Sequence, residues 1–303
     1  MVSEQKADLP SGITLAYETF GASDDEPLLL VMGLGGPMNW WHRDLCTRLA
    51  EQGFFVIRFD NRDVGRSSRV PGQGRLSRKA LVRAYLGDSR VAPYTLSAMA
   101  DDAFDLLDAL GIRSAHVTGV SMGGMIAQTM ALARPGRVRS LVSIMSTTGS
   151  RRVGWSDPRL LRLLLAPPAR SRAEYIERAP IAWRVIGSPD YPAPPDDIRE
   201  RAGETWDRGA DRAGATRQMF AILAQPDRTA GLRRLRLPTC VVHGVADRLV
   251  HRSGGLATAR AVPGAELVLV PGMAHDMPRE LWPIFVDAIV RTAERARSAS
   301  PVG

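Results

Sequence analysis

The 303-residue chain has few cysteines and few lysines, and it lacks a long hydrophobic run. Its two cysteines, Cys46 and Cys240, form no CxxC pair, which argues against a disulfide framework and against a cysteine zinc site. We expect both to be small buried side chains in a reducing compartment. No run approaches the ~18 apolar residues that cross a bilayer, and MVSEQKADLP contains no apolar stretch of a signal peptide. We therefore expect a cytoplasmic protein without a membrane span.

The basic residues outnumber the acidic ones, 40 to 32, for a formal net charge of +8. Two of them are lysines, Lys6 and Lys79, and the arginines are scattered singly along the chain. No nucleic-acid-binding motif accompanies them. The charge therefore indicates a solvated surface, and we expect no nucleic-acid partner.

Apolar runs and helical patterns alternate over most of the chain. The predicted strands are 27–33, 54–60, 115–120, 138–145, 238–244 and 265–272, and the predicted helices are 40–51, 95–110, 122–134, 253–261 and 279–297. Continuous apolar runs are typical of strands that are buried on both faces. The alternation therefore predicts an α/β fold with a mostly parallel sheet and helices on both faces, with 13–21 as an antiparallel edge.

The alternation stops between residues 148 and 235. This stretch is rich in proline, carries helical patterns at 158–166 and 215–224, and shows no clear strand. We therefore predict a helical cap inserted at 148–235, above a core formed by 1–147 and 236–303.

The stretch GVSMGG places a serine, Ser121, between a predicted strand and a predicted helix. Gly119, Ser121 and Gly123 match G-x-S-x-G, the strained turn that presents a nucleophile at the end of a strand. Side chains beside such a turn would clash, which explains the glycines, and Gly124 lets the helix approach a neighbouring strand. The alternative is a turn that merely connects two elements. We predict Ser121 as a nucleophile.

A serine hydroxyl needs a base that takes its proton and an acid that orients the base. With this turn, the chain order is serine, acid, histidine. His275 stands in VPGMAHDMP, on a loop directly after the last apolar run. Asp247 stands on the loop that follows the preceding strand, 238–244. We therefore predict that Asp247 and His275 complete the catalytic set with Ser121.

A metal site is the alternative for part of this region. His243, Asp247 and His251 are spaced by four, which on a helix would bring three ligands to one face. The segment has the pattern of a strand that runs into a loop, so we expect no metal there. We expect His243 to be a buried core residue.

The remaining polar residues near these motifs have structural interpretations. His42 comes too early in the chain order, and His116 lies at the wrong end of its strand. Asp276 is expected to point away from the neighbouring His275. In the segment 59–67, FDNRDVGRS, the charged side chains are expected to form a salt-bridged turn.

An oxyanion at the substrate would need two N–H donors. One is the N–H of Met122, which follows the nucleophile and opens a helix. The other is expected from the loop GLGGPM, where Leu34 is the predicted donor. The same loop faintly matches a dinucleotide-binding pattern, but Met38 replaces its third glycine, which weakens that alternative.

These motifs together resemble the α/β-hydrolase superfamily, and within it the esterases similar to aclacinomycin methylesterase and actinobacterial carboxylesterases. The similarity is carried by LLLVMGLGG, RFDNRDVGRS, GVSMGG and PGMAHDMP. It implies an α/β-hydrolase fold, the same triad of Ser121, Asp247 and His275, and the same donors at Leu34 and Met122. This chain differs from many hydrolases at Met32, where they have histidine before the glycine. The insertion is the part that matches the group least.

The sequence thus predicts a serine hydrolase that cleaves small to medium apolar carboxylic esters through an acyl-enzyme, without cofactor or metal. The alternatives are thioester, lactone or carbon–carbon hydrolysis or perhydrolysis on the same triad, and a non-catalytic small-molecule receptor of this fold. Apolar side chains are expected to line the substrate pocket under the cap. The predicted lining residues are Met38, Trp40, Trp41, Leu164, Trp183 and Phe220.

Overall fold

The computed structural model describes residues 3–70, 77–160 and 169–299 and has an eight-stranded sheet at its centre. The strand order is β1-β2-β4-β3-β5-β6-β7-β8. β2 pairs antiparallel with β1 and with β4, and the other neighbouring strands are parallel. The strands are β1 Gln5–Asp8, β2 Thr14–Phe20, β3 Glu26–Val31, β4 Phe54–Phe59, β5 Ala115–Val120, β6 Val138–Ile144, β7 Thr239–Gly244 and β8 Glu266–Val270. The predicted mostly parallel sheet is confirmed.

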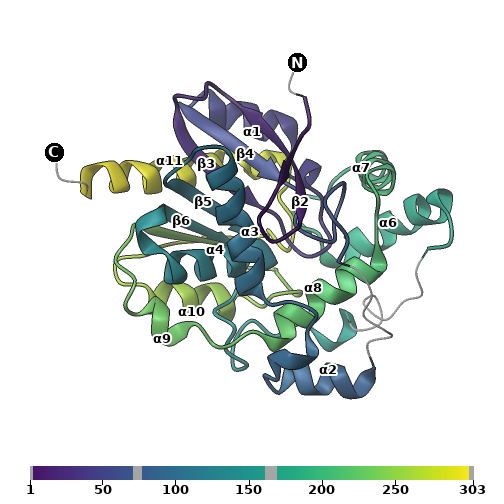
Figure 1. Cartoon of the computed structure of the whole chain (residues 1–303). Helices are drawn as coiled ribbons and strands as arrows, with labels where there is room; N and C mark the ends of the chain where they lie inside the picture. Colours follow the sequence, from purple (N-terminus) through teal and green to yellow (C-terminus); the bar gives the residue numbers. More distant parts are fainter. Residues whose placement is uncertain (1–2, 71–76, 161–168, 300–303) are drawn as a thin grey trace.

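Helices surround this sheet (Figure 1). They are α1 Arg43–Ala50, α2 Arg78–Tyr85, α3 Leu96–Ala109, α4 Met122–Ala133, α6 Arg172–Ile186, α7 Pro195–Asp207, α8 Arg212–Ala224, α9 Thr229–Leu232, α10 Ser253–Ala261 and α11 Trp282–Ala299. Figure 1 shows α6, α7 and α8 on the side of the molecule opposite the end of α11.

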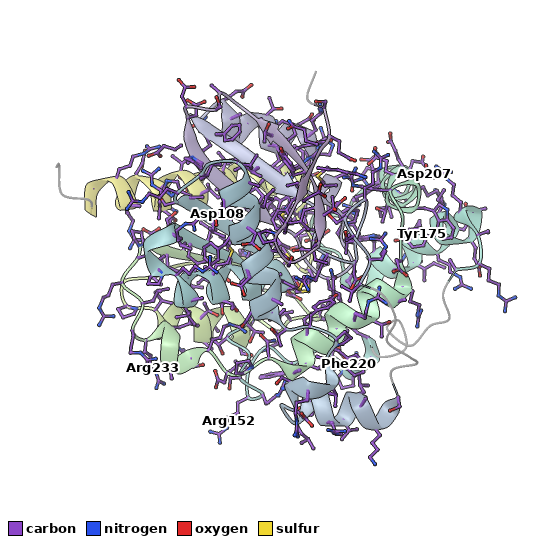
Figure 2. All side chains as sticks on the ribbon, viewed as in Figure 1. Asp108, Arg152, Tyr175, Asp207, Phe220 and Arg233 are labelled. Atoms are coloured by element: carbon purple, nitrogen blue, oxygen red, sulfur yellow. The ribbon has the colours of Figure 1, made fainter. Side chains whose placement is uncertain are left out.

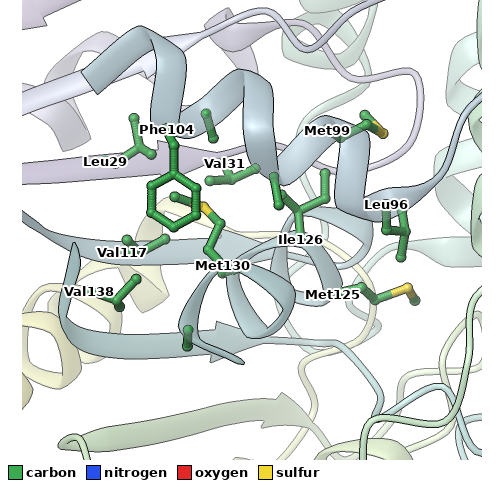
Figure 3. Packing of buried hydrophobic residues seen from close by; sticks show 14 of the residues in the cluster. Leu29, Val31, Leu96, Met99, Phe104, Val117, Met125, Ile126, Met130 and Val138 are labelled. Atoms are coloured by element: carbon green, nitrogen blue, oxygen red, sulfur yellow. The ribbon is translucent and has the colours of Figure 1, made fainter. Parts of the chain in front are cut away.

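The two faces of the sheet carry separate apolar cores, and β3 shows why. Its Leu29 and Val31 point into a core with α3 and α4, as Figure 3 shows. Its Leu28 and Leu30 point the other way, into a core with α1 and α11. All four side chains are fully buried. A central strand that is covered on both faces therefore reads as a continuous apolar run.

The structure differs from the predictions mainly at short or polar elements. β1, with the sequence QKAD, is short and polar and was not predicted, and neither was the eight-residue helix α2. The helix predicted at 40–51 begins only at Arg43, because the His42 side chain accepts the Asp44 N–H and caps it. The edge strand predicted at 13–21 is confirmed as β2.

Helices α6, α7, α8 and α9 lie in the predicted cap, and no strand lies within its described residues. Figure 2 labels Tyr175 on α6 and Asp207 on α7, and Asp207 pairs with the Arg172 guanidinium through two contacts of 2.7 Å. Leu232 of α9 packs in the core with α3 and α4. Leu164 lies in 161–168, outside the described residues. The division into core and cap therefore stays a prediction.

Both cysteines are free and fully buried, as expected. Burial raises the pKa of the Cys46 thiol to about 12 and that of Cys240 to about 11, so neither is a thiolate nucleophile near neutral pH. Within the described part of the chain, no helix is both long and apolar enough to cross a bilayer.

Candidate active site

Ser121 stands at a strained turn between β5 and α4. Its φ is +56° and its ψ −118°, a conformation that L residues rarely adopt. A Cβ on Gly119 would lie 2.1 Å from the Gly123 carbonyl oxygen, and one on Gly123 would lie 2.0 Å from the Val31 carbonyl oxygen. The expected clash of flanking side chains is therefore confirmed.

The structure brings the three predicted catalytic side chains into one hydrogen-bonded series. His275 Nε2 lies 3.0 Å from Ser121 Oγ, and His275 Nδ1 lies 2.8 Å from Asp247 Oδ2. Ser121 follows β5, Asp247 follows β7 and His275 follows β8. Parallel strands end at the same edge of a sheet, which is why residues so far apart in the chain meet there.

Asp247 is fixed on both of its carboxylate oxygens. Oδ1 accepts the N–H groups of Leu249 and Val250, each at 2.9 Å, and Oδ2 faces His275. Burial by itself raises the pKa of Asp247, but the charges and hydrogen bonds of His275 and His243 outweigh it and hold the pKa well below its usual value. Asp247 is therefore a carboxylate at neutral pH and accepts a hydrogen bond from the Nδ1–H of His275.

His243 is fully buried, as predicted, and it lies beside the same carboxylate. Its Nε2 is 2.8 Å from the Val250 carbonyl oxygen and 3.5 Å from Asp247 Oδ2. His251 has other partners, since its ring stacks on Trp155 at 4.3 Å and its Nδ1 bonds Ser253. Among the described residues, no group of three or more His, Cys, Asp or Glu side chains could hold a metal ion.

The loop after β3 lies directly against Ser121. A Cβ on Gly33 would be 3.2 Å from Ser121 Cβ, so the loop borders the serine at Gly33, the residue before Leu34. Gln218 of α8 supports the loop: its Oε1 accepts the Gly35 N–H at 2.8 Å, and its Nε2 donates to the Arg62 carbonyl oxygen. The sequence contains no signal that would have identified Gln218.

The charged side chains of the turn after β4 form salt bridges, but with partners outside the turn rather than with one another, and two of these partners belong to the predicted cap. Asp60 accepts the Met38 N–H at 2.6 Å and pairs with Arg208, which follows α7. Asp63 receives two contacts from Arg217 of α8, at 2.9 and 2.7 Å. Both aspartates are fully buried. The turn thus joins the loop beside Ser121 to α7 and α8.

The predicted pocket residues occupy different surroundings. Met38 and Trp41 are fully buried, Trp41 in the core with α1 and α11. The ring of Phe220, labelled in Figure 2, packs with Ala84 and Ala224 between α8 and α2. Trp40 and Trp183 are only partly buried and meet edge to face at 5.6 Å between ring centres. The lining of a substrate pocket therefore stays a prediction.

Arg201 of α7 lies over the Trp183 ring, with its guanidinium carbon 4.2 Å from the ring centre. Burial lowers the pKa of Arg201, and nearby acidic groups such as Asp276 oppose that shift. This cation–π contact ties α7 to α6 beside the Trp40–Trp183 pair. The sequence patterns did not indicate it.

Known proteins share this fold and sequence pattern. The chain matches the family described as alpha/beta hydrolase fold over residues 26–278. It is 29% identical over 291 residues to the rhodomycin D methylesterase DauP of Streptomyces sp. (strain C5), covering 88% of this chain and 90% of the methylesterase. It is 31% identical over 266 residues to the putative carbamate hydrolase RutD of Azorhizobium caulinodans, covering 86% of this chain and 88% of that protein. A hydrolase from Pseudomonas aeruginosa PA01 matches with a TM-score of 0.71 at 27% identity, over 96% of this chain and 98% of its own.

Proposed function

This chain belongs to the α/β-hydrolase family and is a carboxylic ester hydrolase, and we propose that it works through an acyl-enzyme on Ser121. The observation that carries this proposal is the hydrogen-bonded series from Ser121 Oγ through His275 to Asp247, at 3.0 and 2.8 Å. A strained serine at the start of a helix, next to an oriented imidazole, is suited to nucleophilic attack on a carbonyl carbon.

In the first half-reaction, Ser121 Oγ attacks the acyl carbon while His275 Nε2 takes the hydroxyl proton. The Asp247 carboxylate holds the Nδ1–H and stabilises the imidazolium that forms. His275 then donates its Nε2 proton to the leaving alcohol, and the acyl group stays on Ser121. In the second half-reaction His275 takes a proton from water, which attacks the acyl carbon. The acyl–Oγ bond then breaks as His275 returns the proton to Ser121 Oγ, which releases the acid and regenerates the enzyme.

The negative oxygen of each tetrahedral intermediate needs donors that are already in place. We propose the N–H of Met122, which opens the 12-residue helix α4, and the N–H of Leu34 in the loop against Ser121. The positive end of the α4 dipole adds to this stabilisation. Gln218, which accepts the neighbouring Gly35 N–H, fixes the backbone of that loop.

The substrate we propose is an uncharged small-molecule ester, such as the methyl ester of a larger apolar acid. The Trp40–Trp183 pair supports an apolar wall formed by the cap helix α6 and the loop beside Ser121. The name of a relative, rhodomycin D methylesterase, agrees with a methyl ester of a bulky acid. We propose a cytoplasmic location and a cap spanning 148–235, as the sequence analysis predicts.

Carbamate hydrolysis is a second candidate, because relatives of similar identity are named putative carbamate hydrolases. The same series of residues would attack a carbamate carbonyl, which is less electrophilic than that of an ester. A comparison of kcat/KM for a methyl ester and for the carbamate of matching size distinguishes the two functions.

The experiment that tests the acyl-enzyme combines turnover and labelling. Wild type should hydrolyse p-nitrophenyl butyrate and react with a fluorophosphonate at Ser121. Ser121→Ala should fold, lose roughly 10³-fold or more in kcat and take no label. Wild-type turnover by clean Ser121→Ala would remove the serine from the mechanism. A wild type that binds esters but does not turn them over would be a receptor.

A further inference from the structure

The loop that carries His275 is bound on one side by residues 186–188, which comprise the last residue of α6 and the two residues after it. The His275 N–H donates to the Ile186 carbonyl oxygen at 3.0 Å. The Ala274 N–H donates to Ser188 Oγ at 2.9 Å. Ser188 in turn donates its hydroxyl to Asp276 Oδ1, and its own N–H reaches the same oxygen at 3.0 Å. Residues 274, 275 and 276 are therefore all held by this one segment.

The Ser188 hydroxyl both accepts and donates a hydrogen bond in this arrangement. It accepts one N–H from the residue before His275 and donates its only proton to the residue after it. The side chain is 3% exposed, so water offers little replacement. Removing it would leave the Ala274 N–H without its acceptor and would take a donor from the partly buried Asp276 carboxylate. We call these two residues together the Ser188–Asp276 bridge.

The opposite side of the same loop is bound to the sheet. The Ala246 N–H donates to the Met273 carbonyl oxygen at 2.9 Å, and Asp247 faces His275 Nδ1 at 2.8 Å. The core thus sets the distance to the acid, while the segment 186–188 holds the backbone from the other side.

We propose that Ser188 is a positioning residue for the base: together with Asp276 it holds His275 so that Nε2 lies within reach of Ser121. Asp276 is the carboxylate through which Ser188 acts, and it does not touch the reacting atoms. This inference rests on the proposed function, because it assumes that His275 is the base. The inference goes beyond that function, because it assigns to the end of α6, in the predicted cap, a role in orienting the catalytic base.

The physical consequence concerns rate rather than substrate affinity. A base displaced by about 1 Å can cost roughly 10²-fold in rate. The substrate wall at Trp40 and Trp183 keeps its contacts when the Ser188 hydroxyl is removed. Ser188→Ala should therefore lower kcat by roughly 10- to 100-fold and leave KM within about twofold.

The experiment measures kcat and KM of wild type, Ser188→Ala, Asp276→Ala and the double variant on p-nitrophenyl butyrate. Each rate is divided by the fraction of Ser121 that a fluorophosphonate titrates, so that unfolded protein does not count. If the two residues act through one another, the double variant loses no more in kcat than the more damaged single variant. Ser188→Ala with wild-type kcat, or losses that simply multiply in the double variant, would overturn the proposal.

Two further variants keep the test decisive. Ser140→Ala removes another buried serine hydroxyl, one bonded to His116 at 2.8 Å away from the site, and should leave kcat unchanged. If Ser188→Ala does not fold, Asp276→Ala, which removes the acceptor of both Ser188 contacts, replaces it and should also lower kcat with KM kept. Ser121→Ala is assayed alongside. Its turnover at the wild-type rate would reject the proposed function, whereas an inactive Ser121→Ala with a fully active Ser188→Ala would reject only the Ser188–Asp276 bridge.

Discussion

Oδ2 of Asp247 lies 2.8 Å from Nδ1 of His275, although the residues are 28 positions apart. The other oxygen, Oδ1, accepts the N–H groups of Leu249 and Val250 in the loop of Asp247 itself. These two hydrogen bonds from its own loop hold the Asp247 carboxylate in place independently of its contact with His275. His275 is presented with an acceptor in one orientation, which selects the tautomer that carries its proton on Nδ1.

Asp247→Asn should reduce kcat by roughly 10³- to 10⁴-fold with little change in KM, because an amide cannot hold the same tautomer or stabilise an imidazolium. Turnover of p-nitrophenyl butyrate by the folded variant measures it. A loss of less than tenfold would show that Asp247 does not orient the base.

His243→Ala provides the comparison, because its ring lies beside the same carboxylate. We expect it to lower the free energy of unfolding by about 1–3 kcal/mol, while kcat falls far less than in His275→Ala. The free energy of unfolding in urea and kcat are measured for wild type, His243→Ala and His275→Ala. If folded His243→Ala is inactive and His275→Ala is active, the base is His243.

The buried His116 should make stability depend on pH. Burial, and then the charge of Arg139, lower its pKa to about 4, while the facing Glu26 opposes the shift and Arg297 adds to it. In the unfolded chain the histidine takes up a proton near pH 6.5. Stability is therefore fully present above pH 6.5 and falls as the pH drops towards 4, by about 2 kcal/mol at pH 5.

Urea unfolding at pH 7 and pH 5 checks this expectation. His116→Gln should lose most of the difference between the two pH values. An equal pH dependence in wild type and His116→Gln would mean that other groups cause it.

Chelation should leave activity unchanged, because the proposed chemistry uses a serine, a histidine and a carboxylate. Dialysis against EDTA followed by assay on p-nitrophenyl butyrate measures it. A loss that zinc restores would instead favour the alternative of a metal held by His243, Asp247 and His251.

The acyl-chain preference should show a maximum. Each buried methylene can add up to ~0.8 kcal/mol, about fourfold in kcat/KM, until the pocket is full. The series from p-nitrophenyl acetate through butyrate and octanoate to palmitate should rise and then fall, and Trp183→Ala should lower the maximum. A steady fall from acetate that Trp183→Ala does not change would contradict an apolar wall at this residue.

The sequence by itself determined the features that depend on local backbone geometry. The turn at Ser121 needs glycine at positions 119 and 123, because a side chain there would overlap the backbone. The strands β3 and β5 could be predicted from their apolar runs, because helices cover both faces of these strands. His275 and Asp247 were predictable because parallel strands bring their following loops to one edge.

Only the tertiary structure decided which side chains support that site. Gln218 bonds Gly35 across 183 positions, Arg208 bonds Asp60 across 148, and Ser188 bonds Asp276 across 88. A buried polar group must find a partner, but sequence spacing does not say which one, because the path of 148–235 has no periodic pattern that places it on the sheet. The packing of α6, α7 and α8 selects those partners, and with them the surroundings of the base.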